Sequence, residues 1–247
     1  MGGAAFVASA INAGAGGGSF ISFPAILATG VAPISSNATN NVAMWLGSLA
    51  STGSFRSEID VHRPTLVRML VTSAIGSTLG AILLLRTSNA TFAGLIPFLL
   101  LGATIVFIAG PAIKQAAQNS GHDLTVNSVP GLSLQFVIAA YGGFFGAAIG
   151  ILMLALLTVL GMHDLRRANA FKVLLSTVIN GVAVIPFVIA RAIAWEPAAF
   201  MSVGAIAGGF LGADLVKRLP SHVVRNFVIV VASTMTAYFF WTTYLRK

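Results

Sequence analysis

Lys172 stands inside an apolar stretch of the sequence, and no acidic residue lies within one helical turn of it. Burying an unpaired ammonium group is costly, so a lysine in such a place is a candidate for binding an anion. The alternative is that the side chain extends to the cytoplasmic interface beside Arg166 and Arg167. Both alternatives are open at the level of sequence.

Neutral polar side chains gather around this lysine and in a second stretch nearer the start of the chain. Amide and hydroxyl groups can donate hydrogen bonds to the oxygens of an oxyanion. The candidates are Asn37, Thr39, Asn40, Asn41, Asn169, Ser176 and Asn180. Asn37 and Asn169 stand at predicted helix starts, where helix capping or interhelical hydrogen bonding is the alternative role.

Two glycine-rich interruptions break the apolar pattern, at residues 14–18 and 142–150. Glycine lowers helix propensity, and backbone freed inside a bilayer must be buried in protein or line a polar cavity. A helix that restarts near Ser19 or near Gly150 directs the positive end of its dipole at the break, which favours an anion. The predicted substrate-binding residues are Gly17, Gly18, Ser19, Asn37, Thr39, Asn40, Asn41, Gly146, Gly150, Asn169, Lys172 and Ser176.

The two halves of the chain match each other at an offset of about 132 residues. The matched pairs are Asn37 with Asn169, Asn40 with Lys172, Gly76 with Gly208, Gly80 with Gly212 and Arg86 with Arg218. A duplication with glycine-interrupted apolar segments at matching places indicates a transporter whose site lies between the repeats. We therefore predict that Lys172 and Asn40 face each other across a pseudo-twofold axis and hold the anion together.

Four short motifs occur in order and at the repeat spacing, at residues 16–24, 37–40, 142–146 and 167–172. With these motifs the chain resembles the sulfite exporter TauE/SafE family of bacterial membrane proteins over nearly its whole length. The resemblance implies a multi-pass protein of the bacterial inner membrane that exports sulfite, a small organosulfonate or a related sulfur-containing anion. Ala147 and Ala148 stand where a further glycine is expected, and the thirteen residues before Gly14 suggest a short N-terminus.

The composition is that of an integral membrane protein. Of 247 residues, 57% are hydrophobic and 8% are charged, and the mean hydropathy is +0.92. The net charge of +8 is spread between apolar segments, which indicates loop charges that orient the chain in the membrane and argues against nucleic-acid binding. The chain has no cysteine, and its four histidines fall in loops or at segment ends, so we expect no metal, no cofactor and no enzymatic activity.

The pattern predicts an all-α fold with two homologous repeats in the lipid bilayer. Residues 1–110 form the first repeat, 111–130 a polar linker and 131–247 the second repeat. Each repeat has one glycine-broken segment and three transmembrane helices. The expected segments are 2–30, 38–55, 65–85 and 92–110, then 131–161, 169–190, 198–216 and 222–245.

The distribution of Lys and Arg discriminates between two topologies. If all eight segments cross the bilayer, the charges divide seven to seven and specify no orientation. If each broken segment is a re-entrant hairpin, one face collects ten and the other four. We therefore predict inverted repeats with six crossings and two hairpins. Eight tilted spans, with the first and fifth kinked, are the alternative.

Transport without a carboxylate relay is the function that these features favour. Asp214 is the only acidic residue in a predicted span, and its place four residues before Arg218 indicates an ion pair. We expect a uniporter driven by the membrane potential, which expels anions from a negative cytoplasm. An anion channel, or a carrier of another small organic anion such as a carboxylate, is the alternative. The sequence gives no indication of oligomeric state.

Overall fold

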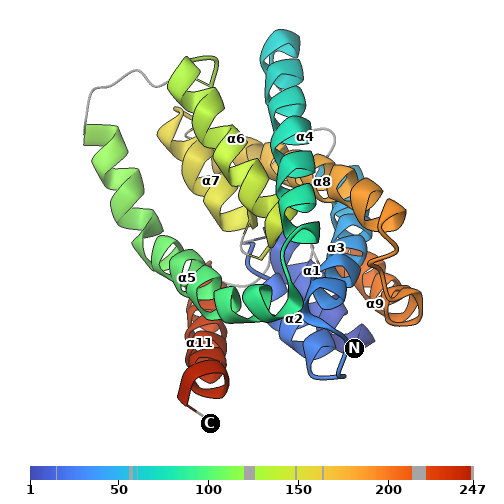
Figure 1. The fold of residues 1–247 in the computed structure, drawn as a ribbon. Helices are drawn as coiled ribbons and strands as arrows, with labels where there is room; N and C mark the ends of the chain where they lie inside the picture. Colours follow the sequence, from blue (N-terminus) through green and yellow to red (C-terminus); the bar gives the residue numbers. More distant parts are fainter. Residues whose placement is uncertain are drawn as a thin grey trace.

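The computed structural model describes residues 1–14, 16–55, 58–59, 61–119, 126–147, 149–162, 164–212 and 221–245. Every regular element in these ranges is a helix, and they contain no strand (Figure 1). The chain is therefore all-helical where it is described, as predicted. Ala148, Asp214 and Arg218, which the sequence analysis names, lie outside the described residues.

The helices follow the predicted segments closely. In the first half they are α1 (Gly2–Gly14), α2 (Ser19–Leu27), α3 (Pro33–Phe55), α4 (Arg63–Leu85) and α5 (Asn89–Asn119). In the second half they are α6 (Val129–Phe144), α7 (Ile149–Val159), α8 (Leu165–Ile189), α9 (Trp195–Ala207) with its π-helical continuation η2 (Gly208–Gly212), and α11 (Ser221–Phe240) with η3 (Trp241–Leu245). Residues 111–119 continue α5, so the first part of the predicted linker is helical.

Four described helices are long and apolar enough to cross a membrane. They cover Arg63–Leu85, Asn89–Gly110, Arg166–Ile189 and Arg225–Leu245. Of the six predicted crossings, α3 and α9 with η2 are not among them. For α3 the reason is that several of its polar residues, such as Asn37 and Asn41, are buried in the protein and lower its hydropathy.

The outer surface of the helix bundle is apolar. On α4, Val67, Val71, Ile75 and Leu79 recur every four residues, and each is more than half exposed. Residues four apart lie on one face of a helix, so α4 carries a continuous aliphatic stripe on its outside. A stripe of this kind is costly in water and favourable against lipid chains.

The two halves are packed reciprocally. Helix α4 of the first half lies along α6 of the second, and α9 with η2 lies along α1. A Cβ atom on Gly80 would collide with the backbone of Ala140, and one on Gly208 with the backbone of Phe6. These glycines therefore serve helix packing within one chain.

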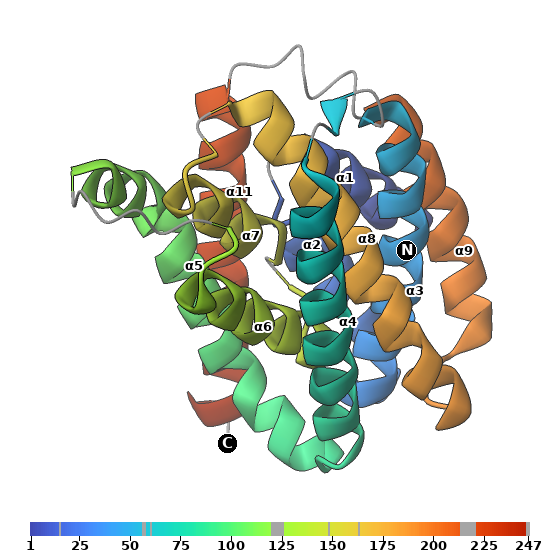
Figure 2. The ribbon, with the colours of Figure 1, turned by 90° about the horizontal axis from the view of Figure 1, so that it is seen from above.

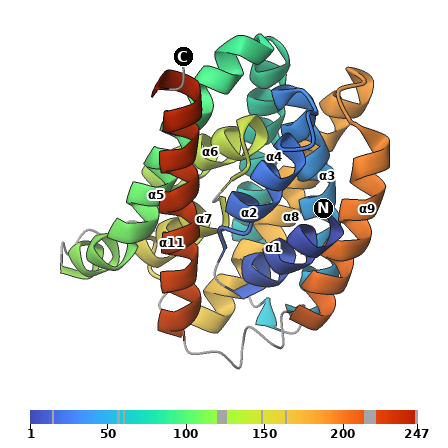
Figure 3. The same cartoon turned by 90° about the horizontal axis from the view of Figure 1, so that it is seen from below.

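Corresponding helices run in opposite directions. In Figure 2, α3 and α5 run upward and α4 runs downward, whereas α8 and α11 run downward and α9 upward. Helices α5 and α11 pack against each other, and Figure 3 shows them crossing.

At the contact of α5 with α11, the Oγ1 atoms of Thr104 and Thr236 are 3.4 Å apart, and the two residues are separated by 132 positions. Each hydroxyl also bonds the carbonyl four residues earlier in its own helix, at 2.7 Å. A residue touches its own counterpart where a twofold axis passes between the two copies. This contact therefore lies where such an axis would run.

Aromatic side chains hold the broken helices against α5 and α11. Phe145, directly after α6, packs edge-on against Phe23 of α2, with ring centroids 5.4 Å apart, and against Phe92 of α5 at 6.0 Å. Phe23 also stacks on Phe239 of α11. All four rings are buried, so this cluster positions the second break relative to the first.

Candidate substrate site between the two broken helices

The first break is built by glycine conformations. Helix α1 ends at Gly14 and α2 begins at Ser19. Gly16 and Gly17 have φ values of +82° and +87°, which side chains rarely adopt. Gly18 packs so closely on the backbone of Ala8 that a Cβ atom would not fit, so the chain folds back on α1 there.

The second break has the same plan and touches the first. Helix α6 ends at Phe144, Gly146 has a φ of +71°, and α7 begins at Ile149. The predicted restarts near Ser19 and Gly150 are therefore confirmed. A Cβ atom on Gly16 would lie 2.9 Å from the carbonyl carbon of Gly150. The two breaks thus meet backbone to backbone.

Lys172 is buried at this meeting point. Its side chain on α8 is 1% exposed, and Nζ donates a 2.9 Å hydrogen bond to the carbonyl of Asn12, in the last turn of α1. Among the described residues the ammonium has no ion-pair partner. The alternative that the side chain extends to the cytoplasmic interface is therefore wrong, because the ammonium is buried against the negative C-terminal end of α1.

Asn37 and Asn169 bind the ends of the broken helices of the opposite half. Asn169 Nδ2 donates to the carbonyl of Ala13 at 3.0 Å, and Asn37 Nδ2 donates to that of Phe144 at 3.2 Å. Neither caps the start of its own helix, since α3 begins at Pro33 and the side chain of Asp164 caps α8. Both side chains therefore make interhelical hydrogen bonds, which satisfy C-terminal carbonyls that a helix leaves unpaired.

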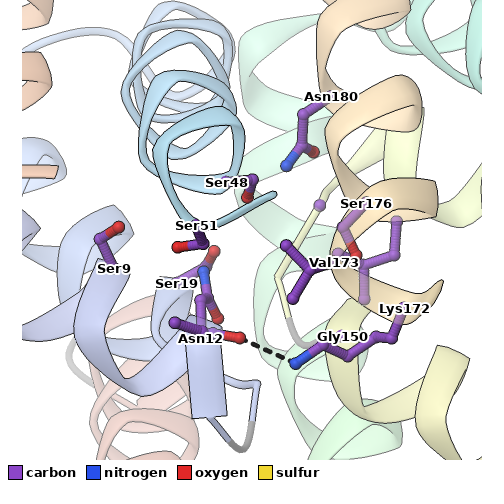
Figure 4. A pocket seen from close by; sticks show the side chains of 13 residues that line it. Ser9, Asn12, Ser19, Ser48, Ser51, Gly150, Lys172, Val173, Ser176 and Asn180 are labelled. Atoms are coloured by element: carbon purple, nitrogen blue, oxygen red, sulfur yellow. Dashed lines mark hydrogen bonds between the residues drawn. The ribbon is translucent and has the colours of Figure 1, made fainter. Parts of the chain in front are cut away.

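A small polar cavity lies between the breaks (Figure 4). Its wall is formed by Ser9, Asn12, Ala13, Ser19, Ser48, Ser51, Gly146, Ile149, Gly150, Lys172, Val173, Ser176 and Asn180. The space in which the centre of a water molecule can lie has a volume of about 20 Å³, so the cavity has room for one or two waters. Helices from both halves contribute to it.

The structure brings some of the predicted residues together at this cavity and not others. Ser19, Gly146, Gly150, Lys172 and Ser176 line it. Gly17 and Gly18 belong to the first break, and Asn37, Asn40 and Asn41 are buried outside the cavity wall. Asn169 is half-buried and also lies outside this wall. Thr39 accepts a 2.9 Å hydrogen bond from the backbone N–H of Ala194 before α9, so its hydroxyl serves helix packing.

Asn12 lines the cavity and was not predicted from the sequence. Its Oδ1 accepts the backbone N–H of Gly18 at 2.7 Å, while its own carbonyl accepts Lys172 Nζ. Asn12 therefore ties the lysine to the first turn of α2. The signal in the sequence was its position directly before the glycine cluster.

Ser48 and Ser51 were also missed. They follow Asn41 by seven and ten residues, so all three fall on one face of α3. Helical periodicity would have found both serines.

The electrostatics of the cavity favour an anion. Lys172 supplies a charge, and the first turns of α2 and α7, at Ser19 and Ile149, supply the positive ends of two helix dipoles. No carboxylate is among the lining residues. The hydroxyl of Ser176 is buried and has no hydrogen-bond partner, so it is available as a donor.

Known sequences identify the family. The profile described as "Sulfite exporter TauE/SafE" matches residues 1–239. The chain belongs to the TauE/SafE family. It is 30% identical to the "Probable membrane transporter protein" of Haemophilus influenzae, over 94% of this chain and 90% of that protein.

Two further relatives carry similar names. The chain is 28% identical to "Probable membrane transporter protein ORF9" of Sinorhizobium sp., over 93% of this chain and 87% of the relative. It is 27% identical to "Probable membrane transporter protein YfcA" of Escherichia coli K12, over 94% and 86%. No solved structure matches significantly. As a TauE/SafE protein the chain is a membrane transporter, and its apolar helices fit a multi-pass arrangement.

Proposed function

We propose that this chain is a secondary transporter of the bacterial inner membrane that exports a small sulfur-containing anion, such as sulfite or an organosulfonate. Lys172 is the anchor for the anion in this proposal, assisted by Ser19, Ser176 and the N-terminal turns of α2 and α7. The observation that carries the proposal is a buried ammonium without a carboxylate partner among the described residues, in a cavity lined by both halves.

The size of the cavity bears on mechanism. Because it has room for only one or two waters, a sulfite ion enters only if the walls move apart. The contact between Gly16 and Gly150 is the place where the walls separate in this proposal. A site that closes around its substrate favours a carrier with alternating access over an open channel. Asn40 does not line this cavity, so the contact of Asn40 with the anion stays a prediction.

Inverted repeats are the architecture that we propose for this motion. The opposite directions of corresponding helices, the reciprocal caps by Asn37 and Asn169 and the contact of Thr104 with Thr236 support it. A motion about a twofold axis through the contact of Thr104 with Thr236 would exchange the conformations of residues 1–110 and 131–247.

Re-entrant hairpins are the proposed form of the broken segments. The four half-helices have 13, 9, 16 and 11 residues. At about 1.5 Å per residue none reaches the roughly 30 Å of a hydrocarbon core. The fold-back of Gly18 on Ala8 also supports hairpins.

The test is a thermal-shift screen of the purified protein at constant ionic strength. Sulfite, sulfate, thiosulfate, taurine, sulfoacetate and simple carboxylates are compared, first with the wild type and then with Lys172→Met. A ligand that binds only the folded state raises the melting temperature with the logarithm of its concentration. We expect sulfur oxyanions to stabilise the wild type and not the variant. Stabilisation by carboxylates alone would change the substrate class.

A second measurement separates carrier from channel. Flux into proteoliposomes is recorded against substrate concentration and against voltage. A saturating rate supports the carrier, and an ohmic current supports a channel.

A further inference from the structure

The carbonyl groups at the ends of the two broken helices, α1 and α6, accept hydrogen bonds from different kinds of donor. At the end of α1, the carbonyl of Asn12 accepts the ammonium of Lys172. Phe144, one repeat length after Asn12, provides the corresponding carbonyl at the end of α6, and it accepts the side-chain amide of Asn37. The counterpart of Lys172 beside α6 is Asn40, which carries no charge. One helix end is thus paired with a cation that belongs to the chain, and the other is not.

Three side-chain oxygen atoms without partners belong to the part of α3 beside the second helix end, whereas at the first end Asn169 contributes one such oxygen. The Oδ1 atoms of Asn37, Asn40 and Asn41 are buried and accept no hydrogen bond, and their side chains are at most 4% exposed. The three residues stand at i, i+3 and i+4 on α3, which places them on one face. Asn37 holds Phe144, and Asn41 Nδ2 lies 3.7 Å from the position of a Cβ on Gly146. This face of α3 therefore borders the end of α6.

A group of acceptors needs a partner with positive charge or with hydrogens to donate. Buried carbonyl oxygens without a partner are costly, and the C-terminal end of a helix is negative. Neutral carbonyl oxygens suit hard cations, and the ends of half-helices with free carbonyls coordinate such ions in transporters. No cluster of three or more carboxylate, histidine or cysteine side chains occurs in the described residues, so a divalent ion lacks its usual ligands.

We propose that Asn37, Asn40 and Asn41, with the C-terminal carbonyls of α6, bind a monovalent alkali cation. The ion occupies the place in the first half that the ammonium of Lys172 occupies in the second. A cation then lies at the end of each broken helix. At α1 it is the ammonium of Lys172, which is part of the chain, and at α6 it is an exchangeable alkali ion.

The position of this cation site connects it to the anion site. Gly146 follows the end of α6 and also lines the cavity that holds Lys172. A cation at this place lowers the cost of bringing an anion into the cavity, so binding of the two ions is coupled. The role in coupling rests on the proposed anion transport, whereas the cation site itself does not.

The test measures the melting temperature of the purified full chain in choline, potassium and sodium chloride at equal concentration, with no other anion added. Choline, a bulky organic cation, serves as the reference. We expect a saturable rise with sodium or potassium over choline, of about 3–6 °C at ten times Kd. Binding of radiolabelled sodium to the wild type gives a second readout that requires no variant.

Two substitutions place in the first repeat the residues that stand at the corresponding positions of the second repeat. Asn41→Val introduces the residue found at the corresponding Val173, and Asn40→Lys introduces the counterpart of Lys172. Asn41→Val should abolish the response to alkali cations. Asn40→Lys should abolish it too and keep the stability of the cation-bound wild type, because its own ammonium fills the site. Asn169→Ala, at the helix end that Lys172 serves, is the matched control and should keep the response.

Equal melting curves in choline and alkali chlorides, together with no sodium binding, would overturn the proposal. So would an unchanged response in Asn41→Val and Asn40→Lys. Adding sulfite at fixed sodium then separates the two proposals. A sodium response without a sulfite response counts only against the anion function, and the reverse counts only against the cation site.

Discussion

Replacing Lys172 with Met keeps the apolar stem of the side chain and removes the ammonium group. Hydrogen bonds to charged groups contribute about 1.5–3 kcal/mol, so loss of this one contact with the anion should lower affinity by roughly 10- to 150-fold. Uptake of labelled anion into proteoliposomes, at substrate concentrations below saturation, should fall by at least tenfold. Lys172→Arg should retain part of the activity, because the charge survives while the donor geometry changes.

The stability of Lys172→Met provides the internal control. In the wild type the ammonium is fully buried, and among the described residues it is held by a carbonyl and by no carboxylate. Replacing a buried charge by an apolar group of similar shape is neutral or stabilising. We therefore expect the free energy of unfolding without substrate to be unchanged or higher while transport is lost. A folded Lys172→Met protein that transports at the wild-type rate would refute the role of this lysine.

Two further predictions test the geometry of the breaks and of the axis. Gly16→Ala should destabilise the protein by about 2–5 kcal/mol, since Ala combines a positive φ with a Cβ that overlaps Gly150, whereas Gly102→Ala, with open space around it, should be tolerated in the same thermal unfolding assay. Because the chain has no cysteine, Thr104→Cys with Thr236→Cys gives a clean cross-linking pair. The double variant should form a disulfide between α5 and α11 on mild oxidation, visible as a mobility shift after proteolysis of the linker, and absence of this bond would contradict the contact.

Local chemistry made much of this fold predictable. The glycines at 16, 17 and 146 take positive φ values and stand where the helices break, because glycine alone adopts that conformation freely. Long apolar runs predicted the helices, and the 132-residue offset predicted that Asn37 and Asn169 have related roles. Such features depend on neighbours in the chain, or on a comparison of the chain with itself.

The partners of the polar side chains depended on packing between distant segments. Lys172 meets Asn12, which is 160 residues away, and Thr39 meets Ala194, which is 155 away. The direction of a polar side chain from a helix follows from the rotation of that helix against its neighbours, which no local pattern specifies. For this reason the sequence predicted an unpaired lysine between two glycine breaks, and the tertiary structure decided that the lysine is buried on the end of α1 rather than extended to the interface.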